Sequence, residues 1–217
     1  MRVGGIVLCG GRSSRMGRPK AWLPFGDEVM LQRVVRVLRE VVDPVVVVAA
    51  PGQDVPALPE GVEIVRDEVE GRGPLAGLAA GLAALEGKAE AAYLSSCDVP
   101  FLKPEFVRRV IDLLQPNPPT PFPKREGPGV GSFAIAVPKV GEYHHPLAAV
   151  YRVGVLPHVR ELLAADRLRP IFLFDAVPTR VLEPSDLADA DPEFASLRNV
   201  NTPVEYEAAL RVMSDES

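Results

Sequence analysis

Apolar residues occur along the chain in short continuous runs that alternate with longer amphipathic stretches. Residues 3–8 (VGGIVL) and 45–50 (VVVVAA) contain no polar side chain. Runs of this kind are typical of strands that are buried on both faces, as in parallel sheets. Between them, residues 30–41 place apolar side chains at helical spacing, with arginines at several of the other positions. This spacing predicts an amphipathic helix, so the chain begins as strand, helix, strand.

The same alternation continues through the rest of the sequence. It predicts strands at 62–65, 92–95, 133–137, 147–152 and 180–182, and helices at 75–85, 105–114, 155–164 and 203–212. The helix at 75–85 consists of leucine, alanine and glycine, so we expect it to pack closely on the sheet. Pro203 suits the first position of a helix, and Asn201 or Thr202 is the expected cap. Together these elements predict an α/β fold: a doubly wound, mostly parallel, Rossmann-like sheet with helices on both faces.

Residues 115–132 (QPNPPTPFPKREGPGVGS) interrupt this alternation with proline and glycine. A segment with so few apolar side chains cannot bury enough surface to offset the entropy that it would lose on ordering. We therefore expect a disordered surface insertion there. Because strands are predicted again after it, we expect residues 1–217 to form a single domain.

Composition and charge exclude several classes of protein. Of the 217 residues, 47% are hydrophobic and 24% are charged, as in ordinary globular proteins. The net charge of −5 argues against a general nucleic-acid binder, which usually carries a basic excess. No apolar run approaches the ~20 residues of a membrane span, and no secretory signal opens the chain. Cys9 and Cys97 are too few for a disulfide scaffold, so we expect buried thiols in a cytoplasmic protein that binds neither nucleic acid nor membrane.

A glycine-rich loop, residues 8–20 (LCGGRSSRMGRPK), follows the first predicted strand directly. Glycines at the carboxyl end of a sheet strand let the backbone approach a phosphate, and successive N–H groups can hold the anion. Arg15 and Lys20 add positive charge within the same loop. The spacing matches neither a P-loop nor the Gly-x-Gly-x-x-Gly of dinucleotide-binding folds. A solvated basic turn therefore stays open beside the phosphate-site interpretation.

Two aspartates also follow predicted strands. Asp98 comes at a carboxyl end where ligands bind in open α/β sheets, and a carboxylate there suits Mg²⁺ together with phosphate oxygens. Asp67 follows another strand and precedes a helix that opens at Gly73-Pro74, so it is a candidate acceptor for the donor edge of a guanine base. The alternatives are a strand-ending turn at Asp98 and a helix-capping loop at Asp67. The three histidines show no metal-ligand spacing.

Asn199 and Asn201 stand two positions apart just before the last predicted helix. In an extended segment, residues at i and i+2 point to the same side, so both amides can face one substrate. Capping of the helix by Asn201 or Thr202 is the alternative.

These segments, in this order, resemble those of a known group of enzymes. The loop at 8–20, followed by Pro24-Phe25-Gly26, resembles the N-terminal signature of nucleotidyltransferases with a Rossmann-like sheet. Four later segments resemble the molybdenum cofactor guanylyltransferases in particular: GPLAG at 73–77, CDVPFL at 97–102, HPLAAVY at 145–151 and NVNTP at 199–203. The resemblance covers most of the chain outside the proline-rich segment.

The resemblance implies a magnesium-dependent enzyme that transfers GMP from GTP to the molybdopterin form of the molybdenum cofactor and releases pyrophosphate. The nucleotide-binding residues that it implies are Leu8, Cys9, Gly10 and Gly11 through their backbones, with Lys20 on phosphate, Asp67 on guanosine and Asp98 on Mg²⁺. Arg15, Lys20 and Asp98 are the implied catalytic residues, and Asn199 and Asn201 the implied acceptor-binding residues. GTP and the cofactor are then substrates, and a molybdoenzyme or a cofactor-insertion protein is the expected partner.

Other functions stay open at this point. A cytidylyltransferase that acts on the molybdenum cofactor or on a sugar phosphate would share the first loop. A non-catalytic, GTP-binding partner of the cofactor would bind nucleotide without releasing pyrophosphate. The chain also departs from the family at Cys9, where alanine is usual, and at Ala49-Ala50, near which many members have an asparagine.

Overall fold

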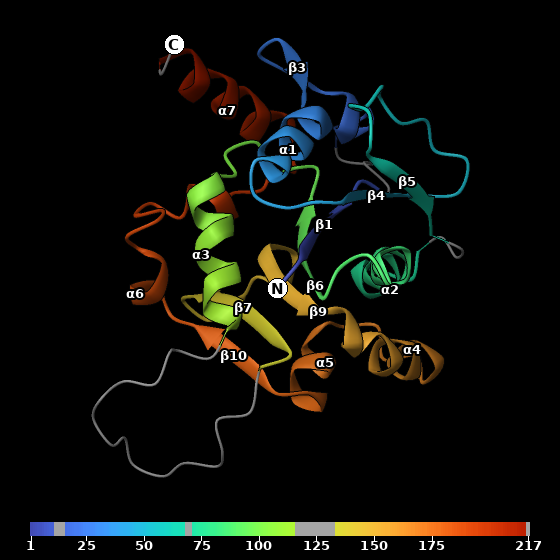
Figure 1. The fold of residues 1–217 in the computed structure, drawn as a ribbon. Coiled ribbons are helices and arrows are strands. Elements are labelled where there is room, and N and C mark those ends of the chain that lie inside the picture. Colours follow the sequence, from blue (N-terminus) through green and yellow to red (C-terminus); the bar gives the residue numbers. More distant parts are fainter. Residues whose placement is uncertain (11–15, 68–70, 116–132, 216–217) are drawn as a thin grey trace.

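A central β-sheet organises the described part of the chain, residues 1–10, 16–67, 71–115 and 133–215, in the computed structural model (Figure 1). The strand order is β10–β7–β9–β6–β1–β4–β5. The strands of this path are β1 (Val3–Leu8), β4 (Val45–Ala49), β5 (Glu63–Arg66), β6 (Ala91–Ser96), β7 (Ile135–Val140), β9 (Ala149–Arg152) and β10 (Thr179–Leu182). Residues 116–132 of the predicted insertion, and the candidate residues Gly11 and Arg15, lie outside the described residues.

Helices cover both faces of this sheet. The α-helices are α1 (Met30–Arg39), α2 (Pro74–Leu85), α3 (Pro104–Leu114), α4 (Leu156–Ala164), α5 (Ile171–Ala176), α6 (Pro184–Leu187) and α7 (Pro203–Asp215). The 3-10 turns are η1 (Lys20–Trp22), η2 (Pro146–Ala148), η3 (Val153–Val155) and η4 (Ala195–Leu197). None of the helices in the described ranges is long and apolar enough to cross a membrane.

The predicted mostly parallel sheet is confirmed, but β9 and the short strand β8 (Tyr143–His144) are antiparallel to their neighbours. β6, β1, β4 and β5 are parallel to one another, and β10 is parallel to β7. β9, predicted as 147–152, runs antiparallel between β6 and β7. The link from β7 to β9 holds only the short strand β8 (Tyr143–His144) and η2. A parallel crossover needs about a dozen residues or more, commonly with a helix, so this short link returns the chain in the opposite direction.

Alternate side chains of the buried strands enter two different cores. Val7, Val45 and Val47 pack with residues of α1 and α3 on one face. Ile6 and Val46 pack with residues of α2, α4 and α5 on the other face. Because successive strand residues point to opposite faces, the uninterrupted apolar runs 3–8 and 45–50 supply both cores. The prediction of helices on both faces is therefore confirmed.

Glycines bring α2 against β1, as its small-residue sequence predicted. A Cβ added at Gly81 would lie 2.6 Å from Ile6 Cγ2, and one at Gly77 would lie 2.9 Å from Leu8 Cδ2. At Gly81 a Cβ would meet both branches of Ile6, so this close approach of helix and strand requires glycine there, whereas at Gly77 the end of the Leu8 side chain would have to move. This close packing holds the first turn of α2 beside the carboxyl end of β1.

A satellite core joins the two ends of the chain. It consists of Met16, Leu23, Phe25, Met30, Val200 and Ala209. The hairpin of β2 (Pro24–Phe25) and β3 (Glu28–Val29) contributes one side, and α7 contributes the other. The Tyr206 hydroxyl of α7 also donates a hydrogen bond to the Pro24 carbonyl. The segment that carries Lys20 and the segment that carries Asn201 are thereby held next to each other.

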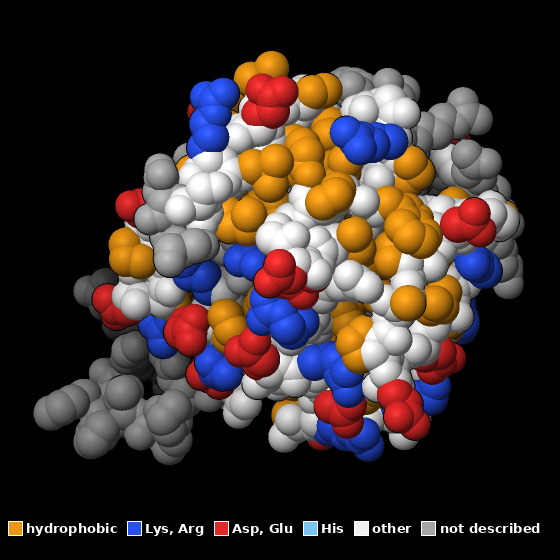
Figure 2. All heavy atoms as spheres, turned by 90° about the horizontal axis from the view of Figure 1, so that it is seen from above, with side chains coloured by type: hydrophobic (Ala, Val, Ile, Leu, Met, Phe, Trp, Pro, Cys, Tyr) orange, Lys and Arg blue, Asp and Glu red, His pale blue; other side chains and the backbone are white. Residues whose placement is uncertain are grey.

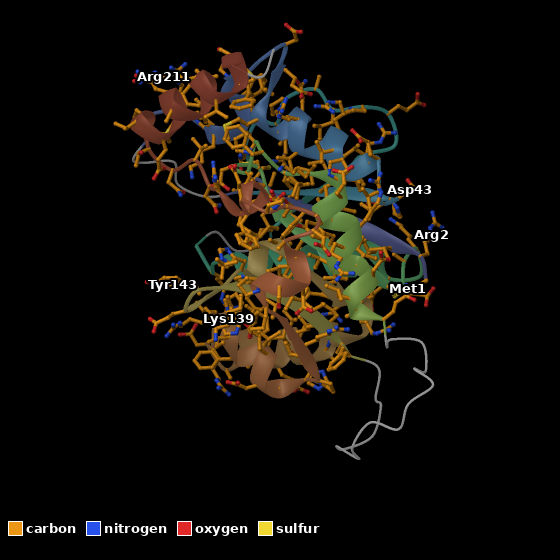
Figure 3. All side chains as sticks on the ribbon, turned by 90° about the vertical axis from the view of Figure 1, so that its left-hand side faces the viewer. Met1, Arg2, Asp43, Lys139, Tyr143 and Arg211 are labelled. Carbon is orange, nitrogen blue, oxygen red and sulfur yellow. The ribbon has the colours of Figure 1, made fainter. Side chains whose placement is uncertain are left out.

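The outside of the molecule shows a group of hydrophobic side chains at one end (Figure 2) and an exposed ion pair at another. Seen from above Figure 1, on the side of β3 and α7, hydrophobic side chains form a broad group with charged side chains around them (Figure 2). In the side view, Arg2 and Asp43 lie together near Met1, and their ion pair measures 3.3 Å (Figure 3). Arg2 and Asp43 precede β1 and β4, so this pair marks the amino-terminal end of the sheet, opposite to the end described next.

Several boundaries and short elements differ from the sequence prediction. The strand predicted at 133–137 runs over Ile135–Val140, and the strand predicted at 147–152 begins only at Ala149, after the turn of η2. The last helix continues beyond 212 to Asp215. The elements α5, α6, β2, β3 and β8 were not predicted, because each is too short for hydrophobic periodicity to show.

Candidate active site

A cleft of about 540 Å³ opens at the carboxyl ends of β1, β4, β5 and β6. β1 lies between β4 and β6, and the chain winds first to one side of β1 and then to the other. Ligands of open α/β sheets bind at such a switch point. The cleft is lined by Leu8, Cys9, Gly10, Lys20, Val48, Ala49, Ala50, Pro51, Asp67, Gly71, Gly73, Pro74, Gly77, Ser96, Cys97, Asp98 and Leu147.

An ion pair between Lys20 and Asp98 lies at one side of the cleft. Lys20 opens η1 and Asp98 follows β6, and their Nζ and Oδ2 atoms are 2.7 Å apart. The two side chains are only 18% and 12% exposed. A pair so little exposed is maintained only when further hydrogen bonds satisfy its remaining lone pairs and protons. This geometry supports the prediction that Asp98 shares a site with Lys20 of the first loop.

Asn199 and Asn201 supply those further hydrogen bonds. Asp98 Oδ1 accepts from Asn199 Nδ2 at 2.9 Å and from Ser96 Oγ at 2.5 Å. Asn201 Oδ1 accepts from Lys20 Nζ at 2.7 Å. We call this group, Lys20, Ser96, Asp98, Asn199 and Asn201, the charged end of the cleft. Three predicted segments that are far apart in the sequence meet in it.

The anchoring of Val200 explains why both asparagines reach the same place. The Val200 N–H donates to the Asp98 carbonyl at 2.8 Å, and its side chain is buried in the satellite core at 3% exposure. Side chains alternate along an extended segment. With Val200 directed into the core, the side chains of Asn199 and Asn201 both reach the Lys20–Asp98 pair.

Thr202, and not Asn201, caps the last helix. Thr202 Oγ1 accepts from the Glu205 N–H at 3.2 Å, while Glu205 Oε2 accepts from the N–H groups of Asn201 at 2.6 Å and Thr202 at 3.0 Å. This is the reciprocal pattern of a capping box. The hydrogen bond from the Asn201 N–H is the main cause that lowers the pKa of Glu205 below 4.5. The capping alternative for the Asn201 side chain is therefore wrong.

The opposite end of the cleft is built mainly from backbone. The Cys9 N–H donates to the Val48 carbonyl at 2.9 Å, and the Leu8 carbonyl accepts from the Cys97 N–H at 3.0 Å. A Cβ at Gly10 would stand 3.1 Å from the Ala50 nitrogen, so the first loop touches the end of β4 there. These contacts fix the position at which the loop starts. The N–H of Cys9 is already hydrogen-bonded within the sheet.

Gln53 is a residue of this end that sequence reasoning missed. Its Oε1 accepts from the Ala50 N–H at 3.0 Å, and its Nε2 donates to the Cys9 carbonyl at 2.9 Å. Arg66 adds hydrogen bonds to the carbonyls of Ala50, at 3.0 Å, and Gln53. One amide side chain therefore joins the loops after β1 and β4. No local pattern marks Gln53, because its partners are distant in sequence or belong to backbone.

Asp67 borders the same end. It follows β5 and its N–H donates to the Ala49 carbonyl at 2.9 Å. Its neighbours along the cleft are Gly73, at φ +74°, and Pro74, the first residue of α2. The predicted start of this helix at Gly73-Pro74 is confirmed. We call Cys9, Gly10, Ala50, Gln53 and Asp67 the backbone end of the cleft.

A divalent metal ion in this cleft would have few protein ligands. Within the described ranges, no group of three or more His, Cys, Asp and Glu side chains could hold a metal ion. Mg²⁺, however, is commonly held by one or two carboxylates together with phosphate oxygens and water. Asp98, which lines the cleft with Oδ2 toward Lys20, fits that arrangement when a phosphate ligand supplies the other oxygens.

The two cysteines, which directly follow β1 and β6, are both buried, as expected. Cys9 and Cys97 are 6% and 5% exposed. Burial raises the pKa of Cys9 to about 11 and raises that of Cys97 further. Thiols of such high pKa are poor nucleophiles, so both serve as small apolar side chains.

The chain is similar to proteins of one family over its whole length. The family model described as "MobA-like NTP transferase domain" matches residues 5–178. A probable molybdenum cofactor guanylyltransferase from Pelotomaculum thermopropionicum is 36% identical over 219 residues, which cover 100% of this chain and 96% of the relative.

Solved structures share the fold. Molybdopterin-guanine dinucleotide biosynthesis protein A from Archaeoglobus fulgidus has a TM-score of 0.73 at 19% identity, covering 98% of this chain and 99% of that one. Rv0371C from Mycobacterium tuberculosis, solved as a complex with manganese, has a TM-score of 0.64 at 21% identity and covers 97% and 99%. At these identities, the structural likeness establishes the α/β architecture.

Proposed function

The chain belongs to the MobA-like NTP transferase family, and from this membership we propose that it transfers GMP from GTP to the molybdopterin form of the molybdenum cofactor and releases pyrophosphate. It is a nucleotidyltransferase, as its relatives are. The observation that carries the proposal is the Lys20–Asp98 pair in a cleft at the switch point of the sheet. A cation and a carboxylate side by side suit a triphosphate and its metal ion.

The chemistry asks the protein mainly for position and charge. The acceptor phosphate is already an anionic nucleophile, so its attack on the α-phosphorus needs no general base. Catalysis then depends on holding the reacting groups in line and on neutralising the developing charge. We propose that Lys20 binds the triphosphate when it enters. Arg15 is proposed as a second cation, on its place in the first loop alone.

The backbone end is proposed to hold the guanosine. Leu8, Cys9 and Gly10 line it, with Gly11 next in the chain. The Cys9 N–H is already hydrogen-bonded to Val48 of β4. We therefore propose that Leu8 and Cys9 contact the guanosine by van der Waals packing and by accepting hydrogen bonds at the remaining lone pairs of their carbonyls. Asp67 is proposed to accept from the ribose or the base. The Gln53 bridge keeps the loops that frame the base in register.

Mg²⁺ is the proposed metal, held by Asp98. When bound, it would neutralise phosphate charge and stabilise the leaving pyrophosphate. Support comes from the carboxylate beside Lys20 and from the neighbouring fold that was solved with manganese. The hydrogen bonds of Asn199 to Asp98 and of Asn201 to Lys20 support a role for both asparagines at the charged end.

The experiment is a comparison of nucleotides. The purified protein is incubated with each of the four nucleoside triphosphates, Mg²⁺ and molybdate-loaded molybdopterin, and pyrophosphate release is measured. We expect pyrophosphate release with GTP and not with the other three nucleoside triphosphates. Release with CTP instead would transfer the specificity to a cytidylyltransferase. Binding of GTP without any pyrophosphate would contradict the catalytic proposal.

A further inference from the structure

The segment of residues 199–201 lies beyond the family match, which ends at residue 178, yet it contacts both charged residues of the cleft. We infer that Asn199 and Asn201 are positioning residues for the triphosphate, acting through Asp98 and Lys20, and that holding the acceptor is not their main role. The inference rests on the proposed function only in taking a metal-bound nucleoside triphosphate as the ligand.

Asn201 fixes the direction of the Lys20 ammonium group. Its Oδ1 accepts from Nζ at 2.7 Å, the same distance as that from Nζ to Asp98 Oδ2. A neutral amide oxygen holds the ammonium without adding a negative charge. A carboxylate at the same place would hold it more tightly but would also repel an incoming triphosphate. An asparagine therefore suits a lysine that must stay in place and still receive phosphate.

Asn199 fixes the orientation of the Asp98 carboxylate. Its Nδ2 and the Ser96 hydroxyl both donate to Oδ1, at 2.9 and 2.5 Å. With Oδ1 occupied by these donors, Oδ2 is the oxygen that faces Lys20. Hydrogen bonds from neighbouring groups orient metal-binding carboxylates in many sites, and their removal commonly costs about 10- to 100-fold in affinity. Asn199 stands in that relation to Asp98.

The C-terminal helix makes this arrangement rigid. Val200 is anchored through its N–H on the Asp98 carbonyl and through its side chain in the satellite core. The N–H of Asn201 is bound by Glu205 of α7. α7 itself is attached to the hairpin after Lys20 through Tyr206 and Ala209. The two asparagines are thus held from both sides, as positioning residues must be.

The competing role, acceptor binding, would use the hydrogen-bonding positions that remain on the two amides. Asn201 Oδ1 and Asn199 Nδ2 are already engaged with Lys20 and Asp98. An acceptor would be contacted by the other atom of each amide, Asn201 Nδ2 or Asn199 Oδ1, or by the remaining lone pair of Asn201 Oδ1 and the second hydrogen of Asn199 Nδ2. The two roles therefore predict different effects of replacing the asparagines. A positioning role predicts weaker triphosphate binding even when no acceptor is present. An acceptor-binding role predicts weaker acceptor binding alone.

The test measures binding without catalysis. Affinity for a GTP analogue with a methylene bridge between the α- and β-phosphates is measured by calorimetry with Mn²⁺ and no acceptor. The variants are Asn199→Leu and Asn201→Leu, which keep the size and lose the hydrogen bonds. Gln32→Leu is the matched control. The side-chain amide of Gln32 makes hydrogen bonds to Val29 and Ala57, which lie outside the cleft.

We expect each asparagine variant to bind the analogue about tenfold more weakly, with guanosine binding and the Gln32→Leu control unchanged. Asn201→Asp, which keeps the acceptor for Lys20, should also weaken analogue binding because it adds negative charge. In transfer assays, KM for GTP should rise while KM for the acceptor stays constant. Asn201→Asp provides the result if a leucine variant does not fold.

Unchanged analogue affinity with a raised acceptor KM would overturn the inference and restore the acceptor role. If the wild-type protein binds the analogue and the variants weaken it, but no GMP reaches molybdopterin, the proposed function fails and this inference stands. Failure of the wild-type protein to bind the analogue would overturn the inference itself.

Discussion

The two ends of the cleft are built in opposite ways. At the charged end, the functional groups are side chains, and Lys20, Asp98 and Asn201 come from segments separated by about 80 to 180 residues of chain. At the backbone end, the hydrogen bonds are made largely by N–H and C=O groups of residues 8–10 and 49–50, joined by the single amide of Gln53. Replacing a side chain removes a functional group at the first end but leaves most contacts intact at the second. Single substitutions should therefore have unequal effects.

The largest effect is expected at Asp98. Asp98→Ala should lower the transfer rate by at least about 10²- to 10³-fold, because it removes the proposed metal ligand and the partner of Lys20. Asp98→Asn, which keeps the shape but not the charge, should be nearly as inactive. Single-turnover rates with Mg²⁺ measure this, and circular dichroism checks the fold. Normal turnover in either variant would remove Asp98 from the metal site.

Lys20 should come next. Lys20→Ala removes one charge-assisted contact to phosphate, so we expect affinity for the GTP analogue to fall by about 10- to 100-fold. Affinity for guanosine should stay the same, since guanosine carries no phosphate. Calorimetry on both ligands tests the division of the cleft into two ends. Equal loss for guanosine would contradict that division.

Gln53 is the side chain on which the backbone end depends. Gln53→Leu leaves the Ala50 N–H and the Cys9 carbonyl without this bridge, and we expect KM for GTP to rise about fivefold with kcat little changed. Gln53→Glu should be as damaging, because its second oxygen would face the Cys9 carbonyl. Steady-state kinetics with GTP and CTP also show whether base discrimination is relaxed. No change in either variant would mean that the loops keep their register without it.

Glu205 gives a small effect that depends on pH. Its pKa in the folded protein is held below 4.5, chiefly by the Asn201 N–H. A lowered pKa stabilises the folded state at pH values above the unfolded pKa, and this stabilisation is lost as the pH falls through the folded value. Glu205→Gln should therefore melt at a lower temperature than the wild-type protein near neutral pH. The difference should disappear in acid, and a difference that persists there would assign the effect to another cause.

Cys9 should give the smallest effect. Its backbone groups bond to Val48 and Gln53, and its buried thiol is not reactive. Cys9→Ala should leave kcat/KM within about twofold and cost about 1 kcal/mol of stability for the lost packing. Chemical denaturation and steady-state kinetics measure the two quantities separately. A large loss of activity would show that the side chain, and not the backbone, contacts the nucleotide.

Local sequence pattern was sufficient for much of the fold. The continuous apolar runs 3–8 and 45–50 became β1 and β4, because both faces of these strands are buried. The leucine, alanine and glycine of 75–85 became a helix that lies against β1. The reversed direction of β9 was not visible, since periodicity reports which side chains are buried but not which way a strand runs.

For the site, the sequence by itself determined which residue types follow which strands: a glycine loop after β1, aspartates after β5 and β6, and a pair of asparagines before α7. Only the tertiary structure decided that Asn201 meets Lys20, that Asn199 meets Asp98, and that Gln53 joins the first loop to β4. The physical reason is that strand and helix patterns arise from neighbours in the chain. Hydrogen bonds between segments far apart in sequence depend on how the buried cores bring those segments together.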